Sequence, residues 1–263
     1  MDLRLSGKTA FVSGSTQGIG YAIAEALLGE GASLIINGRD EGRVRAAIDS
    51  LTVAAPGAVV SGIAADFEDP EQVRHLQDSL GDLDILVNNV GLFEVKSFAH
   101  ISDNDWQRYF DVNVMSGVRL SRLVLPSMLA KNWGRIIFIG SESGVNIPAD
   151  MIHYGVTKAG MLALSNGLAK LTRGTEVTVN TILGGPTYSD GVAHAVDQIS
   201  KAQAVPTAEL KAAIIAGNQT TLLQRFIEPA EIANLALYLA SPLSSATNGA
   251  ALRADGGVLT TVI

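Results

Sequence analysis

The amino end of the chain carries a strand pattern, a glycine-rich turn and a helix pattern in direct succession. Residues 9–12 form a short apolar run, residues 13–20 read SGSTQGIG, and the helical pattern YAIAEALLGEG follows. Glycines let a backbone approach a ligand closely, and the first turn of a helix offers unpaired N–H groups and a partial positive charge. This succession predicts an α/β protein with an anion-binding turn. The spacing G-x-x-x-G-x-G differs from the usual G-x-G-x-x-G, and a tight turn without a ligand is the alternative.

Further strand and helix patterns alternate along the remaining chain. Strand patterns occupy residues 33–37, 58–65, 84–87, 135–139, 176–182 and 249–253, and helix patterns occupy residues 41–51, 70–80, 103–131, 151–173 and 228–240. Alternation of this kind predicts a parallel sheet with helices on both faces. The pattern at 103–131 predicts one long helix with a kink at Pro126. No linker-like stretch divides the 263 residues and 47% of them are hydrophobic, so a single domain over residues 1–263 is expected.

Composition excludes several classes of protein. The chain has no cysteine, which excludes disulfides, thiolate metal sites and cysteine nucleophiles, and we expect no metal site. A formal net charge of -7 argues against a nucleic-acid partner, because that role requires a basic patch. We find no apolar signal-peptide core and no run of about 18 apolar residues that would span a membrane. A soluble cytoplasmic protein without a membrane partner is therefore expected.

The stretch from Gly140 to Lys158 has the character of an active site. Ser141 follows the strand pattern at 135–139, and the carboxyl ends of strands are where open α/β sheets bind ligands. Tyr154 and Lys158 are four positions apart on a helix pattern, which puts both side chains on one face. A nearby ammonium lowers the pKa of a phenol, about 10 when unperturbed, so that the phenol exchanges a proton more readily.

Each of these residues has an ordinary interpretation when it is taken alone. Tyr-x-x-x-Lys is a common pair on helix surfaces, and a serine after a strand is most often a turn residue or a helix cap. The combination favours an active site over these ordinary interpretations, because Ser141 lies thirteen positions before Tyr154, after a strand and downstream of a glycine turn. With these motifs, the chain resembles the short-chain dehydrogenase/reductase family with single-domain subunits, from about Lys8 to Gly257.

The resemblance implies a Rossmann-like three-layer α/β/α sandwich with a seven-stranded parallel sheet in the order 3-2-1-4-5-6-7. It implies an oxidoreductase that transfers a hydride between NAD(P)(H) and a ketone or secondary alcohol. Tyr154 would be the acid/base, Lys158 would lower its pKa and hold the nicotinamide ribose, and Ser141 would hold the substrate oxygen. Asn113, inside the predicted long helix, would disturb that helix and complete a proton relay through water. A homotetramer, or a homodimer, is also implied.

The same resemblance assigns the residues that bind the cofactor. It places the adenine beside Asp66, and the segment Asn88-Asn89-Val90-Gly91 along the cofactor cleft, with Asn89 mostly structural. The full set is Gly14, Ser15, Thr16, Gln17, Gly18, Ile19, Gly20, Arg39, Asp66, Asn88, Gly91, Tyr154, Lys158 and Thr187, with Ile182 as a further contact. Gly184 stands where the family has a proline before the threonine, so the resemblance does not predict the backbone conformation at this turn.

The end of the second strand pattern bears on the choice of cofactor. An NAD site expects an acid near this point for the ribose hydroxyls, whereas an arginine accommodates the 2′-phosphate of NADP. Gly38 occupies the acid position and Arg39 follows it, so NADP(H) is favoured. NAD(H) is the alternative if Asp40 serves as the acid, but Asp40 is also a suitable helix N-cap. Arg39 as a solvated surface charge is the other alternative.

Residues 188–219 form two weak helix patterns and are interpreted as a lid over a small-molecule substrate. Candidate substrate-contacting residues are Glu142, Asn146, Ile147, His153, Tyr188 and His194, although His153 is interpreted chiefly as a packing or surface histidine. Two rival functions are a non-catalytic Rossmann protein that senses a nucleotide and a methyltransferase. The complete set of Ser141, Tyr154, Lys158 and Asn113 argues against both, because neither function requires it.

Overall fold

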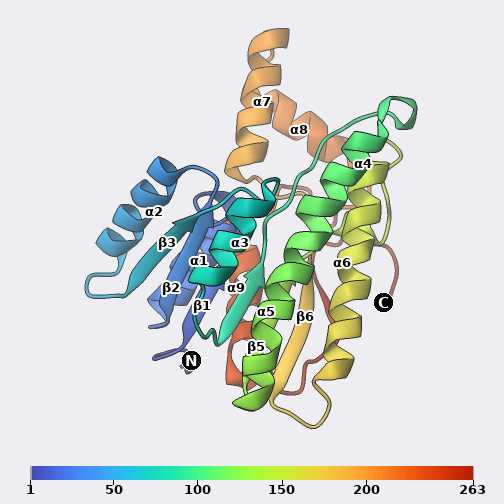
Figure 1. Cartoon of the computed structure of the whole chain (residues 1–263). Coiled ribbons are helices and arrows are strands. Elements are labelled where there is room, and N and C mark those ends of the chain that lie inside the picture. Colours follow the sequence, from blue (N-terminus) through green and yellow to red (C-terminus); the bar gives the residue numbers. More distant parts are fainter. Residues whose placement is uncertain (1, 263) are drawn as a thin grey trace.

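The computed structural model describes residues 2–262, and over this part of the chain the strands form one parallel sheet (Figure 1). The strands are β1 Thr9–Val12, β2 Ser33–Gly38, β3 Val60–Ala64, β4 Ile85–Asn88, β5 Gly134–Ile139, β6 Val177–Gly184 and β7 Ala251–Ala254. Their order in the sheet is β3-β2-β1-β4-β5-β6-β7, and every pairing is parallel. The predicted fold class and strand order are confirmed.

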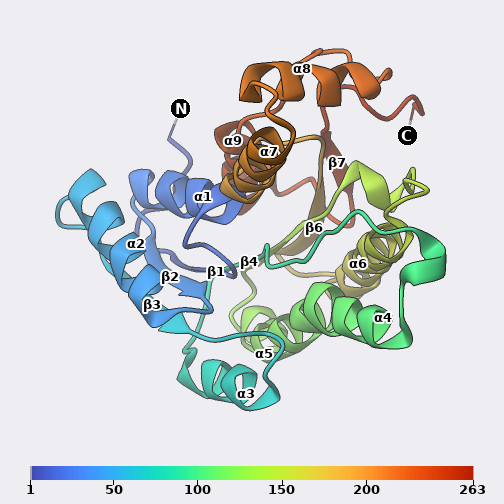
Figure 2. The same ribbon diagram turned by 90° about the horizontal axis from the view of Figure 1, so that it is seen from above.

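Helices cover both faces of the sheet, as the view from above shows (Figure 2). They are α1 Gly18–Gly29, α2 Glu41–Ala54, α3 Pro70–Ser79, α4 Asp103–Tyr109, α5 Ser116–Ala130, α6 Ile152–Leu171, α7 Asp190–Gln203, α8 Thr207–Gly217 and α9 Pro229–Ala240. Helices α1, α2 and α9 cover one face, and α3, α5 and α6 cover the other. This gives the expected three layers.

The strands bury side chains on both faces, which explains their nearly continuous apolar sequences. Ala10 and Val12 of β1 contribute to the core beneath α1 and α9, whereas Phe11 between them contributes to the core beneath α3 and α5. All three side chains are fully buried. Because successive strand residues point to opposite faces, one short strand joins the two cores.

The segment predicted as one long helix is helical throughout and contains a π-helical turn in its middle. After α4, the π-helical segment Phe110–Met115 leads directly into α5, and Asn113 lies within it. The Asn113 side chain accepts a hydrogen bond from Leu92 N–H (2.7 Å) and donates to Leu92 O (3.0 Å) and Thr157 Oγ1 (2.9 Å). The predicted long helix is therefore present, and the expected disturbance at Asn113 takes the form of this π-helical turn. Pro126 lies inside α5.

Helices α7 and α8 project beyond the edge of the sheet at which the strands end (Figure 1). They fall within residues 188–219, the predicted lid, and are joined by Ala204, which has a left-handed φ of 51°. Few of their side chains are buried, Val196 and Ile215 being the buried members. These two helices therefore pack more loosely than the helices of the three layers.

Candidate active site

A cleft of about 660 Å³ opens at the carboxyl ends of β1 to β5 and extends to α6. Eleven of the predicted site residues line it: Gly14, Thr16, Gln17, Gly18, Ile19, Gly20, Arg39, Asp66, Gly91, Tyr154 and Lys158. Ser15, Asn88, Asn113, Ser141 and Thr187 are buried next to it instead. The structure thus brings the glycine turn and the Tyr-Lys pair, far apart in the sequence, into one cleft.

The glycine turn is held tightly against β4, and the first turn of α1 begins inside it. A Cβ atom on Gly20 would lie 2.3 Å from Gly14 O and 2.5 Å from Asn89 Nδ2, so no side chain fits there. Asn89 Nδ2 donates to the carbonyls of Ser13 and Gly14, both at 2.9 Å, which agrees with its predicted structural role. The bare backbone at this helix end is suited to hold a pyrophosphate.

Ser15 and Asn88 are buried beside the cleft and bond to the protein. Ser15 Oγ donates to Val12 O (2.6 Å) and accepts from Asn37 N–H (3.0 Å), which ties the turn to β2. Asn88 Nδ2 donates to Ser121 Oγ (3.4 Å). Within residues 2–262, Asn88 Oδ1 is a buried atom without a hydrogen-bond partner. The geometry therefore favours a positioning role for the Ser15 side chain.

The lid reaches the same glycine turn through a carboxylate. Gly18 N–H donates to Asp190 Oδ2 (2.6 Å), and Ser189 and Gly191 line the cleft at this point. Helix N-termini favour anions, and a carboxylate bound here is consistent with that preference. The residues present therefore fit a dinucleotide with its phosphates at the amino end of α1.

Gly38, at the end of β2, packs closely against the glycine turn. A Cβ atom on Gly38 would lie 2.5 Å from Thr16 Cγ2, so a side chain at this position would require the Thr16 side chain to move. Asp40 Oδ1 accepts from Arg43 N–H (2.8 Å) and caps α2, the helix-cap role proposed from the sequence. Arg39 lines the cleft, and so does Arg43, which sequence reasoning missed although it lies four positions further along the chain.

Ser141, Tyr154 and Lys158 meet at the carboxyl end of β5. Lys158 Nζ donates to Ile139 O (2.8 Å) and lies 5.7 Å from the centre of the Tyr154 ring. Ser141 Oγ donates to Glu142 Oε2 (2.6 Å) and accepts from Ser143 N–H (3.1 Å). Asn113 bonds to Thr157, the neighbour of Lys158 in the chain, and to the backbone of Leu92.

Burial, rather than the Tyr-Lys pairing, decides the pKa values of these two groups. Desolvation raises the pKa of Tyr154 to about 12, against the lowering effect of the neighbouring Ser141 side chain. Desolvation also lowers the pKa of Lys158 to about 8. Burial disfavours the charged form of both groups in the protein alone, and the lowering of the phenol pKa by Lys158 stays a prediction. Tyr154 keeps its proton at neutral pH.

Thr187 is buried and does not line the cleft, so its contact with the cofactor stays a prediction. Its Oγ1 donates to Gly185 O (2.9 Å), and its backbone forms a bridge with Ile227. Ser189, two residues later, lines the cleft instead, and its only sequence signal is a small polar residue at the start of the lid. Gly184 extends β6 and pairs with Ala254, so the missing proline leaves an ordinary strand end.

The six candidate substrate-contacting residues lie in different surroundings. His153 is fully buried, packs 4.1 Å from the Tyr109 ring, and has no hydrogen-bond partner on either ring nitrogen within residues 2–262. Burial lowers its pKa, so it is a neutral packing histidine. Tyr188 packs against Phe226, and His194 contacts Gln198. Asn146 and Ile147 are exposed on the loop after β5. Glu142, bonded to Ser141, is the candidate nearest the Tyr-Lys pair.

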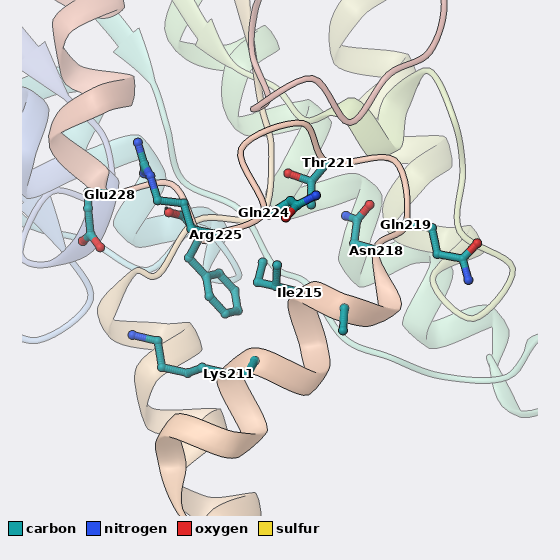
Figure 3. Close-up of a pocket in the computed structure, with 11 residues that line it drawn as sticks. Lys211, Ile215, Asn218, Gln219, Thr221, Gln224, Arg225 and Glu228 are labelled. Carbon is teal, nitrogen blue, oxygen red and sulfur yellow. Dashed lines mark hydrogen bonds between the residues drawn. The ribbon is translucent and has the colours of Figure 1, made fainter.

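A second cavity of about 510 Å³ lies between α8 and the segment that follows it (Figure 3). Lys211, Ile215, Thr221 and Phe226 are among its lining residues, and none of its lining residues lines the larger cleft. Lys211 Nζ lies 3.5 Å from the centre of the Tyr188 ring. The cavity therefore lies between α8 and the segment 218–228.

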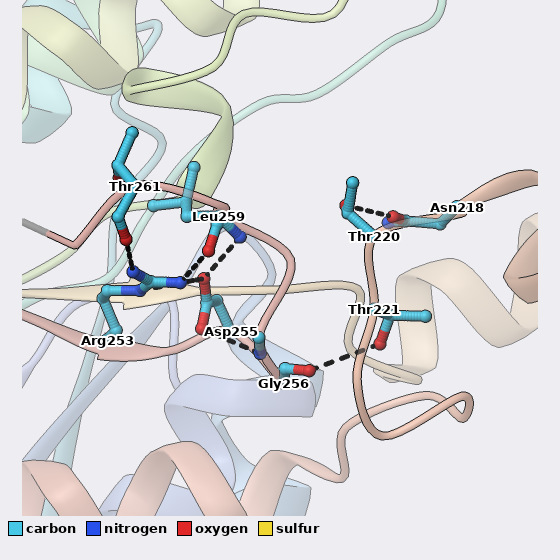
Figure 4. Close-up of polar contacts among 9 residues, drawn as sticks. Asn218, Thr220, Thr221, Arg253, Asp255, Gly256, Leu259 and Thr261 are labelled. Atoms are coloured by element: carbon cyan, nitrogen blue, oxygen red, sulfur yellow. Dashed lines mark hydrogen bonds and ion pairs between the residues drawn. The ribbon is translucent and has the colours of Figure 1, made fainter.

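The segment after α8 is anchored to the end of β7 (Figure 4). Leu222 N–H donates to Gly256 O (2.9 Å), and Thr221 Oγ1 contacts the same carbonyl. Arg253 pairs with Asp255 (3.1 Å) and donates to the carbonyl of Thr261 (2.7 Å), which holds the last turn in place. The carboxyl end of the lid is thus fixed.

Among residues 2–262, no group of three or more His, Cys, Asp or Glu side chains is arranged to hold a metal ion. No helix within those residues has the length and apolar character needed to cross a membrane.

Comparison with known proteins places this fold and site in a family. The family model for short chain dehydrogenase matches residues 8–200. The uncharacterized oxidoreductase YvaG of Bacillus subtilis is 46% identical over 100% of both chains, and the D-beta-hydroxybutyrate dehydrogenase of Cupriavidus necator is 34% identical over 96% of this chain and 98% of its own. The crystal structure of L-sorbose reductase from Gluconobacter frateurii, complexed with NADPH and L-sorbose, is 32% identical, covers 100% of both chains and superposes with a TM-score of 0.93.

This chain belongs to the short-chain dehydrogenase family. It is an oxidoreductase acting on CH–OH or keto groups, as the family match and the enzymes named above indicate.

Proposed function

We propose that the protein reduces a ketone to a secondary alcohol with NADPH. The observation that carries the proposal is the position of the Tyr154 phenol, which lines the cleft together with Lys158 and lies 5.7 Å, from ring centre to Nζ, from that lysine. A phenol keeps its proton at neutral pH and can donate it to a carbonyl oxygen, and a cation beside it would stabilise the phenolate that remains. The similar L-sorbose reductase was crystallised with NADPH and a keto sugar, which supports the same reaction class.

The arginines at the end of β2 support the choice of NADP(H), with NAD(H) as the alternative. Arg39 and Arg43 both line the cleft there, and a guanidinium pairs well with a phosphate. Gly38 supplies no acid for the ribose hydroxyls of NAD, and Asp40 caps α2. Asp66 lines the same end of the cleft, where the adenine would lie.

In the proposed reaction, the bound cofactor supplies the hydride. Residues of this chain bind the substrate and supply the proton: Ser141 holds the substrate oxygen, and Tyr154 donates its proton to that oxygen. Lys158, fixed by Ile139 O, would hold the cofactor's ribose and stabilise the phenolate once the proton has left. We assign to Asn113 the support of the loop at Leu92 and of the helix that carries Lys158, and a proton relay through water remains its proposed further role.

The assay that tests this function follows absorbance of the nicotinamide band with a panel of keto sugars, keto esters and keto acids. We expect oxidation of NADPH with at least one ketone of the panel, and slower oxidation of NADH. Binding of the dinucleotide without turnover of any ketone or alcohol would favour the rival function, a non-catalytic nucleotide sensor. Failure to bind a dinucleotide would contradict both ketone reduction and nucleotide sensing.

We also propose a homotetramer, with a homodimer as the alternative, and a cytoplasmic location that rests on the composition. Phe110 and Leu123 leave 38% and 36% of their surface exposed beside α5, which a two-fold interface would cover. Light scattering at micromolar concentration should give four times the 27.5 kDa mass of the chain. A monomeric mass would contradict the assembly, and a mass of two chains would favour the dimer.

A further inference from the structure

The carboxylate of Glu142 lies beside the serine that would hold the substrate oxygen. Ser141 Oγ donates to Glu142 Oε2 (2.6 Å), and Ser143 Oγ donates to Glu142 Oε1 (3.2 Å). Glu142 begins the short helical turn Glu142–Gly144 directly after β5, and its side chain is half-buried. Two neighbouring serines therefore hold the carboxylate just after β5, next to the end of the cleft that Gly140, Tyr154 and Lys158 line.

No cation neutralises this carboxylate in the described structure. Within residues 2–262, Glu142 has no ion-pair partner within 4.0 Å, and the nearby Lys158 ammonium donates to Ile139 O instead. The charge of Glu142 nevertheless interacts with the reacting groups, because its Coulomb interaction acts to raise the pKa of both Tyr154 and Lys158. A substrate group bound beside Ser141 would therefore lie close to this carboxylate.

We propose that Glu142 is a specificity-determining residue that selects uncharged ketones with a hydroxyl group next to the carbonyl and disfavours keto acids. The inference rests on the proposed ketone reduction and names its substrate class. An ionised carboxylate only accepts hydrogen bonds and has several lone pairs, so hydroxyl groups of the substrate are suitable partners. A carboxylate on the substrate would be repelled at the same place, and partial burial reduces the screening of this repulsion by solvent.

Two matched pairs of substrates test the proposal in the full-length protein with NADPH. Methyl acetoacetate and acetoacetate differ in charge, and hydroxyacetone and acetone differ in one hydroxyl group. We expect the wild-type kcat/KM to be at least about tenfold higher for the ester than for the acid, and higher for hydroxyacetone than for acetone. Glu142→Gln should reduce the first ratio by about tenfold or more, chiefly by improving the reduction of acetoacetate, and should also reduce the second.

Control measurements separate charge from folding. Glu142→Gln keeps the size of the side chain and its ability to accept from Ser141, so its NADPH affinity should match the wild type. Glu71→Gln removes the same charge from an exposed position in the first turn of α3, outside the cleft, and should leave both substrate ratios unchanged. A change in the ratios with Glu71→Gln would mean that the total charge of the protein, not Glu142, sets the preference.

The same four ketones are also titrated into the enzyme with bound NADPH, and the fluorescence of the dinucleotide reports their affinities. Turnover of none of them, together with tighter binding of the uncharged and hydroxylated members, would contradict the proposed reaction and still support the role of Glu142. Equal or better use of acetoacetate by the wild type would overturn the role of Glu142. An unchanged ester-to-acid ratio in Glu142→Gln would also overturn the role of Glu142. So would the absence of binding by any of the four ketones.

Discussion

Replacing Tyr154 by phenylalanine is expected to reduce turnover by about 10²- to 10⁴-fold, the usual contribution of a positioned general acid or base. The substitution removes the hydroxyl that carries the proton and keeps the ring, which lies in the cleft beside Lys158. NADPH affinity should change little, because the proposed lysine contact to the ribose is retained. Steady-state kinetics on a proven substrate and a fluorescence titration with NADPH measure the two quantities.

Lys158→Ala is the informative comparison, because this lysine has two proposed tasks. It should weaken both turnover and NADPH binding. Burial lowers the pKa of Lys158 to about 8, so its cation is present below pH 8 and is lost as the pH rises through that value. The wild-type reduction rate should therefore fall above about pH 8, and the variant should lack this fall. A Tyr154→Phe enzyme that keeps most of its activity would contradict the assignment of the proton donor.

Arg39→Ala is expected to weaken NADPH binding by about ten- to a hundredfold, since a charge-assisted contact to a phosphate contributes about 1.5 to 3 kcal/mol. NADH binding should barely change, because NADH lacks the 2′-phosphate. Arg43, which lines the same end of the cleft, would retain part of the attraction, so the double variant should lose more than either single variant. Titration of both dinucleotides against each variant measures the difference.

Arg45→Ala provides the control for charge. Arg45 is an exposed residue of α2 that does not line the cleft, so its loss should leave NADPH affinity nearly unchanged. If the wild type prefers NADH, or if Arg39→Ala and Arg45→Ala have the same effect on NADPH, the assignment of the 2′-phosphate site is wrong.

The strands, the helices and the Tyr-Lys pair were accessible from the sequence because they depend on local patterns, whereas the strand order came from the family resemblance. The two-residue alternation and the helical period mark each element, and four positions on a helix necessarily place Tyr154 above Lys158. The π-helical turn within 103–131 was not accessible from periodicity, because it depends on bonds between Asn113 and Leu92, a residue of another segment. The place of Thr187 also depended on a distant partner, Ile227.

The sequence by itself determined which residue types are present and how those within one element face each other: the bare glycine turn, the serine after β5 and the pair on α6. The tertiary structure alone decided their chemical state. The pKa of Tyr154 rises because segments from several parts of the chain remove water from it, and the charge of Glu142 acts there because the turn after β5 folds against α6. Desolvation and Coulomb interactions depend on distance in space, which local sequence patterns do not specify.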